Sequence, residues 1–81
     1  MSDATRYALQ RAIRAERARA GLSQAQLAER LGWARTTMAA VESGERRVNA
    51  DELPEICRAL GVTLAVLVQM APEDERRSLG V

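Results

Sequence analysis

The chain has 81 residues, enough for one small domain, and its formal net charge is only +1. Hydrophobic residues make up 47% and charged residues 28%, as in ordinary globular proteins. One Cys and no His exclude an internal disulfide framework, a Cys/His zinc site and a histidine base. No apolar run approaches the ~20 residues of a membrane-spanning helix, and no signal-peptide core is present. We therefore expect a cytoplasmic binding module with no membrane contact, no cofactor, no metal and no enzymatic activity.

The charge distribution weakly favours a polyanionic partner. Residues 1–71 contain ten arginines and eight acidic residues, whereas residues 72–81 contain two arginines and three acidic residues. With so small an excess of positive charge, binding to a nucleic acid requires that the arginines gather on one face of the domain.

Glycines separate five expected helices. Four glycines each follow a helix-like pattern: Gly21, Gly32, Gly44 and Gly61. Glycine is common at the end of a helix because it adopts the left-handed conformation there. The first helix is expected over residues 3–20, with Leu9, Ile13 and Ala20 on one stripe. Arg17 lies on the same stripe, so its charge needs a partner within the fold.

The second and third helices are expected over residues 23–31 and 35–43. Ser23 is the expected N-cap of the second helix, and Trp33 lies in the turn between the two. Apolar residues at helical spacing predict the buried faces of both helices: Leu27, Ala28, Leu31, Met38 and Val41. A polar, basic loop follows the third helix.

The start of the fourth helix has two interpretations. Asn49 followed by Glu52 reads as a capping box. With Asn49 as the cap, however, Pro54 would be the fifth helical residue and would remove a backbone hydrogen bond. With Asp51 as the cap, Pro54 falls in the first turn, so we favour Asp51. The residues expected to be buried in this helix are Leu53, Ile56, Cys57 and Leu60.

The fifth helix is expected to begin at its cap, Thr63, and to end near Met70. Its expected buried residues are Leu64, Leu67 and Val68. Pro72 interrupts the pattern. Residues 72–81 form a short charged tail that either adds one helical turn or frays.

The second and third helices, joined by a turn that contains glycine, have the outline of a helix-turn-helix. Ala28 is small where two helices that cross at a steep angle must approach each other. Gly32 supplies the positive φ that a tight turn requires. Apolar contacts that join both helices to the core are expected from Leu27, Leu31, Trp33, Met38 and Val41.

The stretch from residue 21 to 47, GLSQAQLAERLGWARTTMAAVESGERR, resembles the Cro/cI-type (XRE-like, lambda-repressor-like) DNA-binding domain. The resemblance extends to Leu60-Gly61-Val62-Thr63-Leu64 and covers roughly residues 9–70. It implies an all-α, compact bundle of five short helices over residues 1–71. It also implies that the third helix enters the major groove of double-stranded DNA.

The resemblance also implies the roles of individual residues. Base-facing positions fall on Arg35, Thr36, Ala39 and Ala40, and Thr37 is a further candidate. Among them Arg35 is the expected main reader, and the two alanines suit thymine methyl groups. Phosphate-contacting positions fall on Gln24, Ser43, Arg46 and Arg47. Glu42 falls where members of the family pair a glutamate with an arginine of the first helix, here Arg17.

Structural or solvent-exposed roles remain open for several of these residues. Arg35 is alternatively a solvated residue at a helix start, and Arg46 and Arg47 a solvated pair in a loop. Ser23 is assigned to capping rather than to a phosphate contact. Trp33 is assigned to the core.

Together these features predict a sequence-specific transcriptional regulator, expected to act as a repressor. A single helix-turn-helix reads few base pairs, so we expect a homodimer on a pseudo-palindromic operator. Apolar outward positions of the fifth helix are candidates for the dimer interface: Ala65, Val66 and Met70. The alternative is an antitoxin-type module that binds a toxin partner and autoregulates through the same helix-turn-helix.

Overall fold

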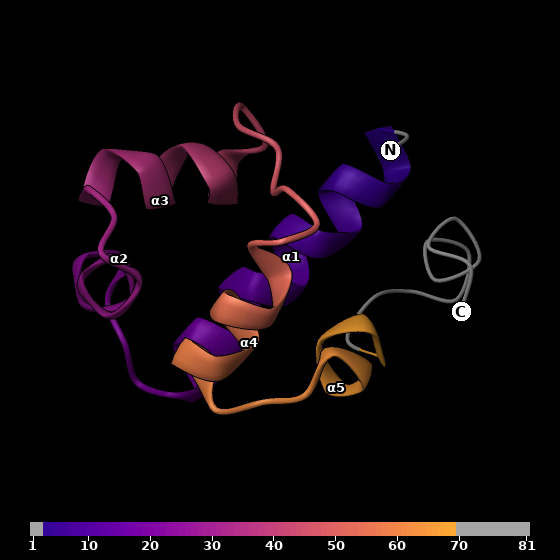
Figure 1. Ribbon diagram of the computed structural model, residues 1–81. Coiled ribbons are helices and arrows are strands. Elements are labelled where there is room, and N and C mark those ends of the chain that lie inside the picture. Colours follow the sequence, from indigo (N-terminus) through magenta and orange to yellow (C-terminus); the bar gives the residue numbers. More distant parts are fainter. Residues whose placement is uncertain (1–2, 70–81) are drawn as a thin grey trace.

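The computed structural model describes residues 3–69, with side chains described for residues 8–67. This part of the chain folds into five helices and contains no strand, as the sequence predicted (Figure 1). The helices are α1 (Asp3–Arg19), α2 (Gln24–Leu31), α3 (Arg35–Ser43), α4 (Leu53–Leu60) and α5 (Leu64–Gln69). None of them is long and apolar enough to cross a membrane.

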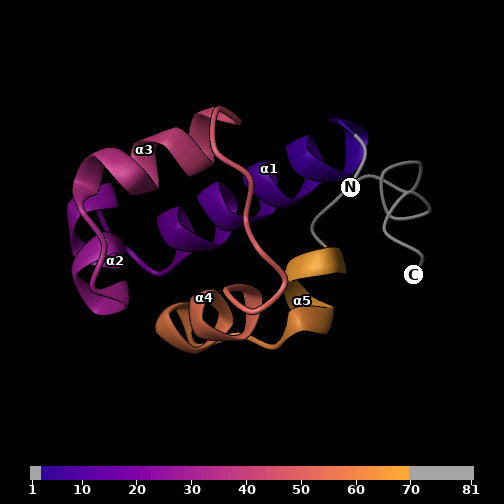
Figure 2. The ribbon, with the colours of Figure 1, turned by 45° about the horizontal axis from the view of Figure 1, so that its top comes forward.

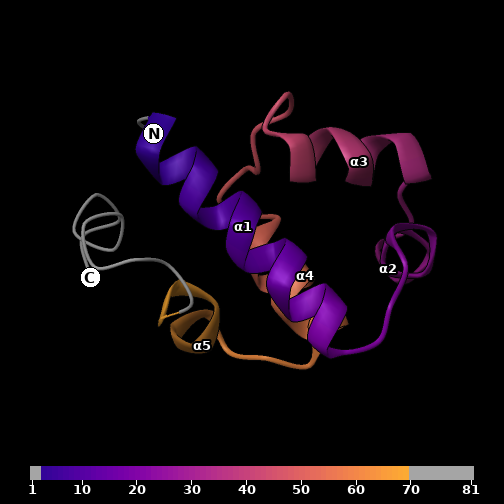
Figure 3. The same cartoon turned by 180° about the vertical axis from the view of Figure 1, so that it is seen from behind.

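The longest helix, α1, is in contact with α3, α4 and α5. Figures 1 and 3 show α4 lying along one side of α1, and Figure 2 shows α2 and α3 packed together at the end opposite α5. In this arrangement α3 lies along an edge of the bundle, and no other described helix covers its outer side. One face of α3 is thereby left open to a partner.

The helices surround one hydrophobic core to which all five contribute. Its largest fully buried side chains are Ile13, Leu27, Met38, Val41, Ile56 and Leu67. Cys57 is buried as expected, and burial raises the pKa of its thiol. Leu31 and Leu53 are only half-buried at the margin of the core. Ala20 is exposed, contrary to expectation, because α1 ends at Arg19 and the chain turns there.

The core stripe of α1 also contains an unanticipated carboxylate, Glu16. Its side chain is 3% exposed, and its Oε1 lies 3.6 Å from Nη1 of Arg19. Within the described part of the chain this oxygen accepts no hydrogen bond. The signal was present in the sequence, because Glu16 follows Ile13 by three residues and shares its side of the helix.

Two expected N-caps are present. At α2, the Ser23 hydroxyl accepts the Gln26 N–H at 3.0 Å, and the Gln26 Oε1 accepts the Ser23 N–H at 2.8 Å, which completes a capping box. At α5, the Thr63 hydroxyl accepts the Val66 N–H at 3.1 Å. These caps satisfy backbone donors that the first turn of a helix leaves without partners.

The start of α4 differs from both interpretations of the sequence, although one half of the capping box is present, because Glu52 Oε1 accepts the Asn49 N–H at 2.9 Å. The helix begins at Leu53 with Glu52 as its N-cap, so the preference for Asp51 was wrong by one residue. The reason is a turn over residues 49–52, in which the Glu52 N–H donates to the Asn49 backbone carbonyl at 2.9 Å. Pro54 falls in the first turn, as expected, where its missing N–H costs no helical bond.

The expected burial of α5 is wrong for Leu64, which is 48% exposed. Leu67 is fully buried, and Val62, in the turn before the helix, is partly buried against the core. The side chains of Val68 and Met70, and the tail over residues 72–81, lie outside the described residues.

We expect Gly32→Val to destabilise the fold through backbone strain alone. Gly32 ends α2 with φ +71°, and a Cβ built there meets no atom within 4 Å. A residue held in this left-handed region costs about 1–3 kcal/mol, and a β-branched side chain tolerates it least. Asn tolerates positive φ, so urea unfolding should show that Gly32→Asn is more stable than Gly32→Val. Equal losses in the two variants would contradict the conformational explanation.

Candidate nucleic-acid interface

The open face of α3 is a shallow groove with a floor of small side chains. Thr36, Ala39, Ala40 and Ser43 line it together with Glu45 from the following loop, and its volume is about 270 Å³. The four helical residues recur every three or four positions, which places them on one side of α3. The structure therefore brings together three of the predicted base-facing residues and one predicted phosphate contact.

The remaining two base-facing candidates occupy different positions. Arg35 is the first residue of α3 and is exposed, so its guanidinium is accessible at one end of the groove. Thr37 is half-buried and is not among the side chains that line the groove. Arg35 is thus a long, exposed hydrogen-bond donor at the start of α3, and its role as a reader of bases stays a prediction.

An ion pair between Arg17 and Glu42 lies beneath this face. Arg17 Nε donates to Glu42 Oε2 at 2.7 Å, and Nη2 donates to Oε1 at 2.9 Å. The third nitrogen of the guanidinium, Nη1, donates to the Leu22 carbonyl at 2.8 Å. The side chains are 16% and 3% exposed, and the hydrogen bond with Glu42 raises the pKa of Arg17. The pairing that the resemblance implied is present, and it joins α1 to α3.

The N-terminus of α2 lies beside this ion pair. The Gln24 amide donates to Glu42 Oε1 at 3.2 Å. A second depression, of about 220 Å³, is lined by Gln24, Ser43 and Ala39, by the paired Arg17 and Glu42, and by Arg14, an exposed residue of α1. Sequence reasoning missed Arg14, although it precedes Arg17 by one helical turn and so shares its side of α1. An exposed guanidinium and a helix N-terminus together attract anions.

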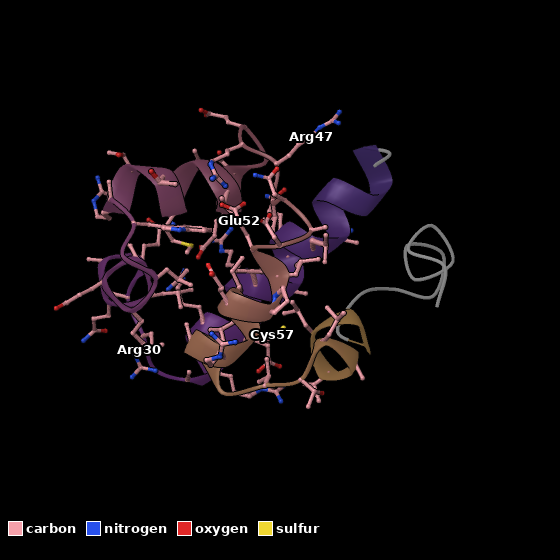
Figure 4. The ribbon with its side chains drawn as sticks, in the orientation of Figure 1. Arg30, Arg47, Glu52 and Cys57 are labelled. Carbon is pink, nitrogen blue, oxygen red and sulfur yellow. The ribbon has the colours of Figure 1, made fainter. Side chains whose placement is uncertain are left out.

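The loop after α3 holds two arginines in different environments. Arg46 Nη2 donates to Glu52 Oε2 at 2.8 Å, and Arg46 Nη1 donates to Glu52 Oε1 at 3.2 Å. The Arg46 guanidinium carbon lies 5.0 Å from the centre of the Trp33 ring. Arg47 is exposed and points away from the globule, whereas Glu52 lies below the loop (Figure 4). Arg46 and Arg47, which were both predicted to contact phosphate, therefore lie in different environments.

Hydrogen bonding lowers the pKa of the Glu52 carboxyl. The bonds from Arg46 and, secondarily, from the Asn49 N–H hold the pKa of this carboxyl below its ordinary value, although partial burial opposes the shift. The same carboxylate raises the pKa of Arg46. Both partners are thus charged at neutral pH.

Apolar side chains are exposed on α5. Leu64 is 48% and Val66 37% exposed, and Ala65 is exposed between them. Two of the three residues predicted for a dimer interface are therefore on the surface, and the third, Met70, lies outside the described residues.

Comparison with known proteins agrees with this geometry. A family model described as helix-turn-helix matches residues 13–67. A crystal structure of the clp gene regulator ClgR from Corynebacterium glutamicum is 33% identical, with a TM-score of 0.75 over 82% of this chain and 86% of that one. Another structure of ClgR is 28% identical, with a TM-score of 0.80 over 94% of this chain and 81% of that one. No curated protein matches the chain.

Proposed function

We propose that this chain, which belongs to the XRE-type helix-turn-helix family of DNA-binding transcription regulators, reads double-stranded DNA with the outer face of α3. The observation that carries the proposal is the open, shallow groove on α3 with Arg35 exposed at its start. Small side chains allow the helix backbone to approach the floor of the major groove closely. Arg35 then supplies a fork that fits guanine O6 and N7, and Ala39 and Ala40 contact thymine methyl groups.

Phosphate contacts are proposed on both sides of this groove. Gln24 and Ser43 contact one strand at the N-terminus of α2, and Arg14 adds a positive charge to them. Arg47 contacts phosphate from the loop after α3. Arg46 is set apart from these residues because the Glu52 carboxylate already accepts hydrogen bonds from both of its outer nitrogens.

We further propose that the protein acts as a homodimeric repressor on a pseudo-palindromic site. The exposed apolar side chains of α5, Leu64, Ala65 and Val66, support a self-complementary interface. The alternative, an antitoxin-type module, would use the same surface to bind a toxin, and a co-purifying small protein would distinguish it from a homodimer.

Arg35→Ala is expected to weaken binding to the preferred DNA by about 1–3 kcal/mol and to relax the preference at one guanine per half-site. The preferred site is obtained by selection from a random DNA pool. Binding is then measured on that site and on a version mutated at the guanine. If Arg35→Ala lowers affinity equally on both DNAs, Arg35 is a phosphate anchor and the proposed reader is wrong.

Arg47→Ala provides the contrasting variant, with Arg30→Ala as its control. Arg30 and Arg47 project from opposite sides of the molecule (Figure 4), so both variants lose one charge but only Arg47 lies on the proposed DNA-binding side. Because Arg30 Nη1 also donates to the Ala59 carbonyl at 3.0 Å, circular dichroism verifies that Arg30→Ala is folded. Arg47→Ala should weaken binding to all sequences alike and lower the salt slope by about one. A similar slope change in Arg30→Ala would show that the α3 side is not the binding face.

A further inference from the structure

Three segments that are separate in the sequence meet at the Arg46 guanidinium. Trp33 comes from the turn before α3, Arg46 from the loop after α3, and Glu52 from the N-cap of α4. Glu52 also accepts the Asn49 N–H at 2.9 Å, and Arg46 Nη1 donates to the Arg47 carbonyl at 3.2 Å. We call Trp33, Arg46 and Glu52 the Arg46 cluster. It joins the loop over residues 44–52 to the turn before α3 and to the start of α4.

The partners of Arg46 conflict with a direct role in binding phosphate. Its two outer nitrogens form a fork on the Glu52 carboxylate, and its central carbon lies over the Trp33 ring, 5.0 Å from the ring centre. The bonds to Glu52 and to the Arg47 carbonyl occupy three of the five guanidinium N–H donors, so Arg46 holds a phosphate with the same fork only by releasing Glu52. That release would leave the Glu52 carboxylate, 15% exposed, without its cation. Glu52 would then stand as an uncompensated negative charge near a polyanion.

The same contacts favour Arg47 as the residue that is presented to DNA. Arg47 is exposed and points away from the globule, while its backbone carbonyl is held by Arg46 (Figure 4). The Arg46 N–H donates to the Ala40 carbonyl at 3.1 Å, which ties the loop to the end of α3. Prior ordering of a binding loop lowers the entropy that binding would otherwise cost.

We propose that Arg46 is a positioning residue, which holds the loop after α3 through Trp33 and Glu52 so that Arg47 reaches phosphate beside the α3 groove. This assignment replaces the sequence-based expectation that Arg46 itself contacts phosphate, and it rests on the proposed DNA-binding function. It also gives Glu52, an acidic residue, a favourable role in binding a polyanion.

The decisive variant is Glu52→Gln, because a positioning role and a purely electrostatic role for Glu52 predict opposite changes in DNA affinity. Removal of a negative charge strengthens DNA binding if electrostatics alone decides. Release of the loop instead weakens binding about threefold to tenfold, since side chains that were held must be ordered on binding. We expect the weaker binding with an unchanged salt slope, because no phosphate contact is lost. Binding equal to or tighter than that of the original chain would overturn the proposal.

Arg46→Lys tests the same assignment without a change in charge. A lysine retains a phosphate contact, but it cannot form the fork on Glu52 or stack its charge over Trp33 as a guanidinium does. We expect Arg46→Lys to weaken binding as much as Glu52→Gln, and the double variant to be no weaker than either alone. Full affinity in Arg46→Lys would instead assign Arg46 to phosphate.

Trp33, the only Trp of the chain, gives a readout that needs no DNA. Loss of the Arg46 contact should expose the indole further and shift its emission to longer wavelength in both Glu52→Gln and Arg46→Lys. Far-ultraviolet circular dichroism verifies that each variant is folded. If the original chain selects no DNA sequence, the proposed function fails while the emission still reports the cluster. Unchanged emission in both folded variants would overturn the inference about Arg46.

Discussion

Glu42→Ala is expected to lower the free energy of unfolding by about 3–5 kcal/mol, the cost of breaking a buried ion pair from one side. Glu42 is 3% exposed, and its carboxylate accepts two hydrogen bonds from Arg17 at 2.7 and 2.9 Å. The truncated variant leaves a largely buried guanidinium without its counter-charge and frees the Gln24 amide. Because small domains are stable by only about 5–15 kcal/mol, urea unfolding should show a large shift of the midpoint.

A matched control for this variant is Glu29→Ala, which removes an exposed carboxylate from α2. Such surface substitutions change stability by no more than about 0.5 kcal/mol. Arg17→Ala should resemble Glu42→Ala, and the double variant should lose less than the sum of the two single losses because neither charge is then left alone. Additive losses would show that the two residues do not stabilise each other, and a midpoint for Glu42→Ala like that of Glu29→Ala would show that Glu42 contributes little to stability.

Leu27→Ala is expected to cost about 2–5 kcal/mol, since it removes apolar contacts and leaves a cavity. Leu27 is fully buried between the two helices of the helix-turn-helix and the rest of the core. The same substitution at Leu64, which is 48% exposed, should change stability by no more than about 0.5 kcal/mol. Urea unfolding of both variants at low protein concentration measures the contrast without a contribution from dimerisation.

This pair of variants also tests the corrected burial of α5. If Leu64→Ala loses as much stability as Leu27→Ala in the monomer, Leu64 belongs to the core as its helical spacing suggested. A loss for Leu64→Ala that appears only at high protein concentration would instead place Leu64 in the interface between two copies, beside Ala65 and Val66.

The sequence alone was sufficient for the helices, the helix-turn-helix and most of its core. Caps, left-handed glycines and apolar periodicity act over three or four residues, so Ser23, Gly32 and Leu27 could be placed without tertiary information. The partner of Arg17 was found because an arginine on a buried stripe requires a carboxylate, and the resemblance supplied Glu42. The caps, glycines and buried positions depend on neighbouring residues, and the ion pair depends on a residue type that the family resemblance identified.

Tertiary structure decided what depends on segments that meet only after folding. Nothing in the sequence distinguishes Arg46 from Arg47, because the difference lies in Glu52 and the Trp33 ring, which the loop brings to Arg46 but not to its neighbour. The exposure of Leu64 likewise depends on which side of a six-residue helix meets α1 and α4. An arginine or leucine has the same local propensity in either environment. Its role is set by long-range packing, which short-range periodicity does not encode.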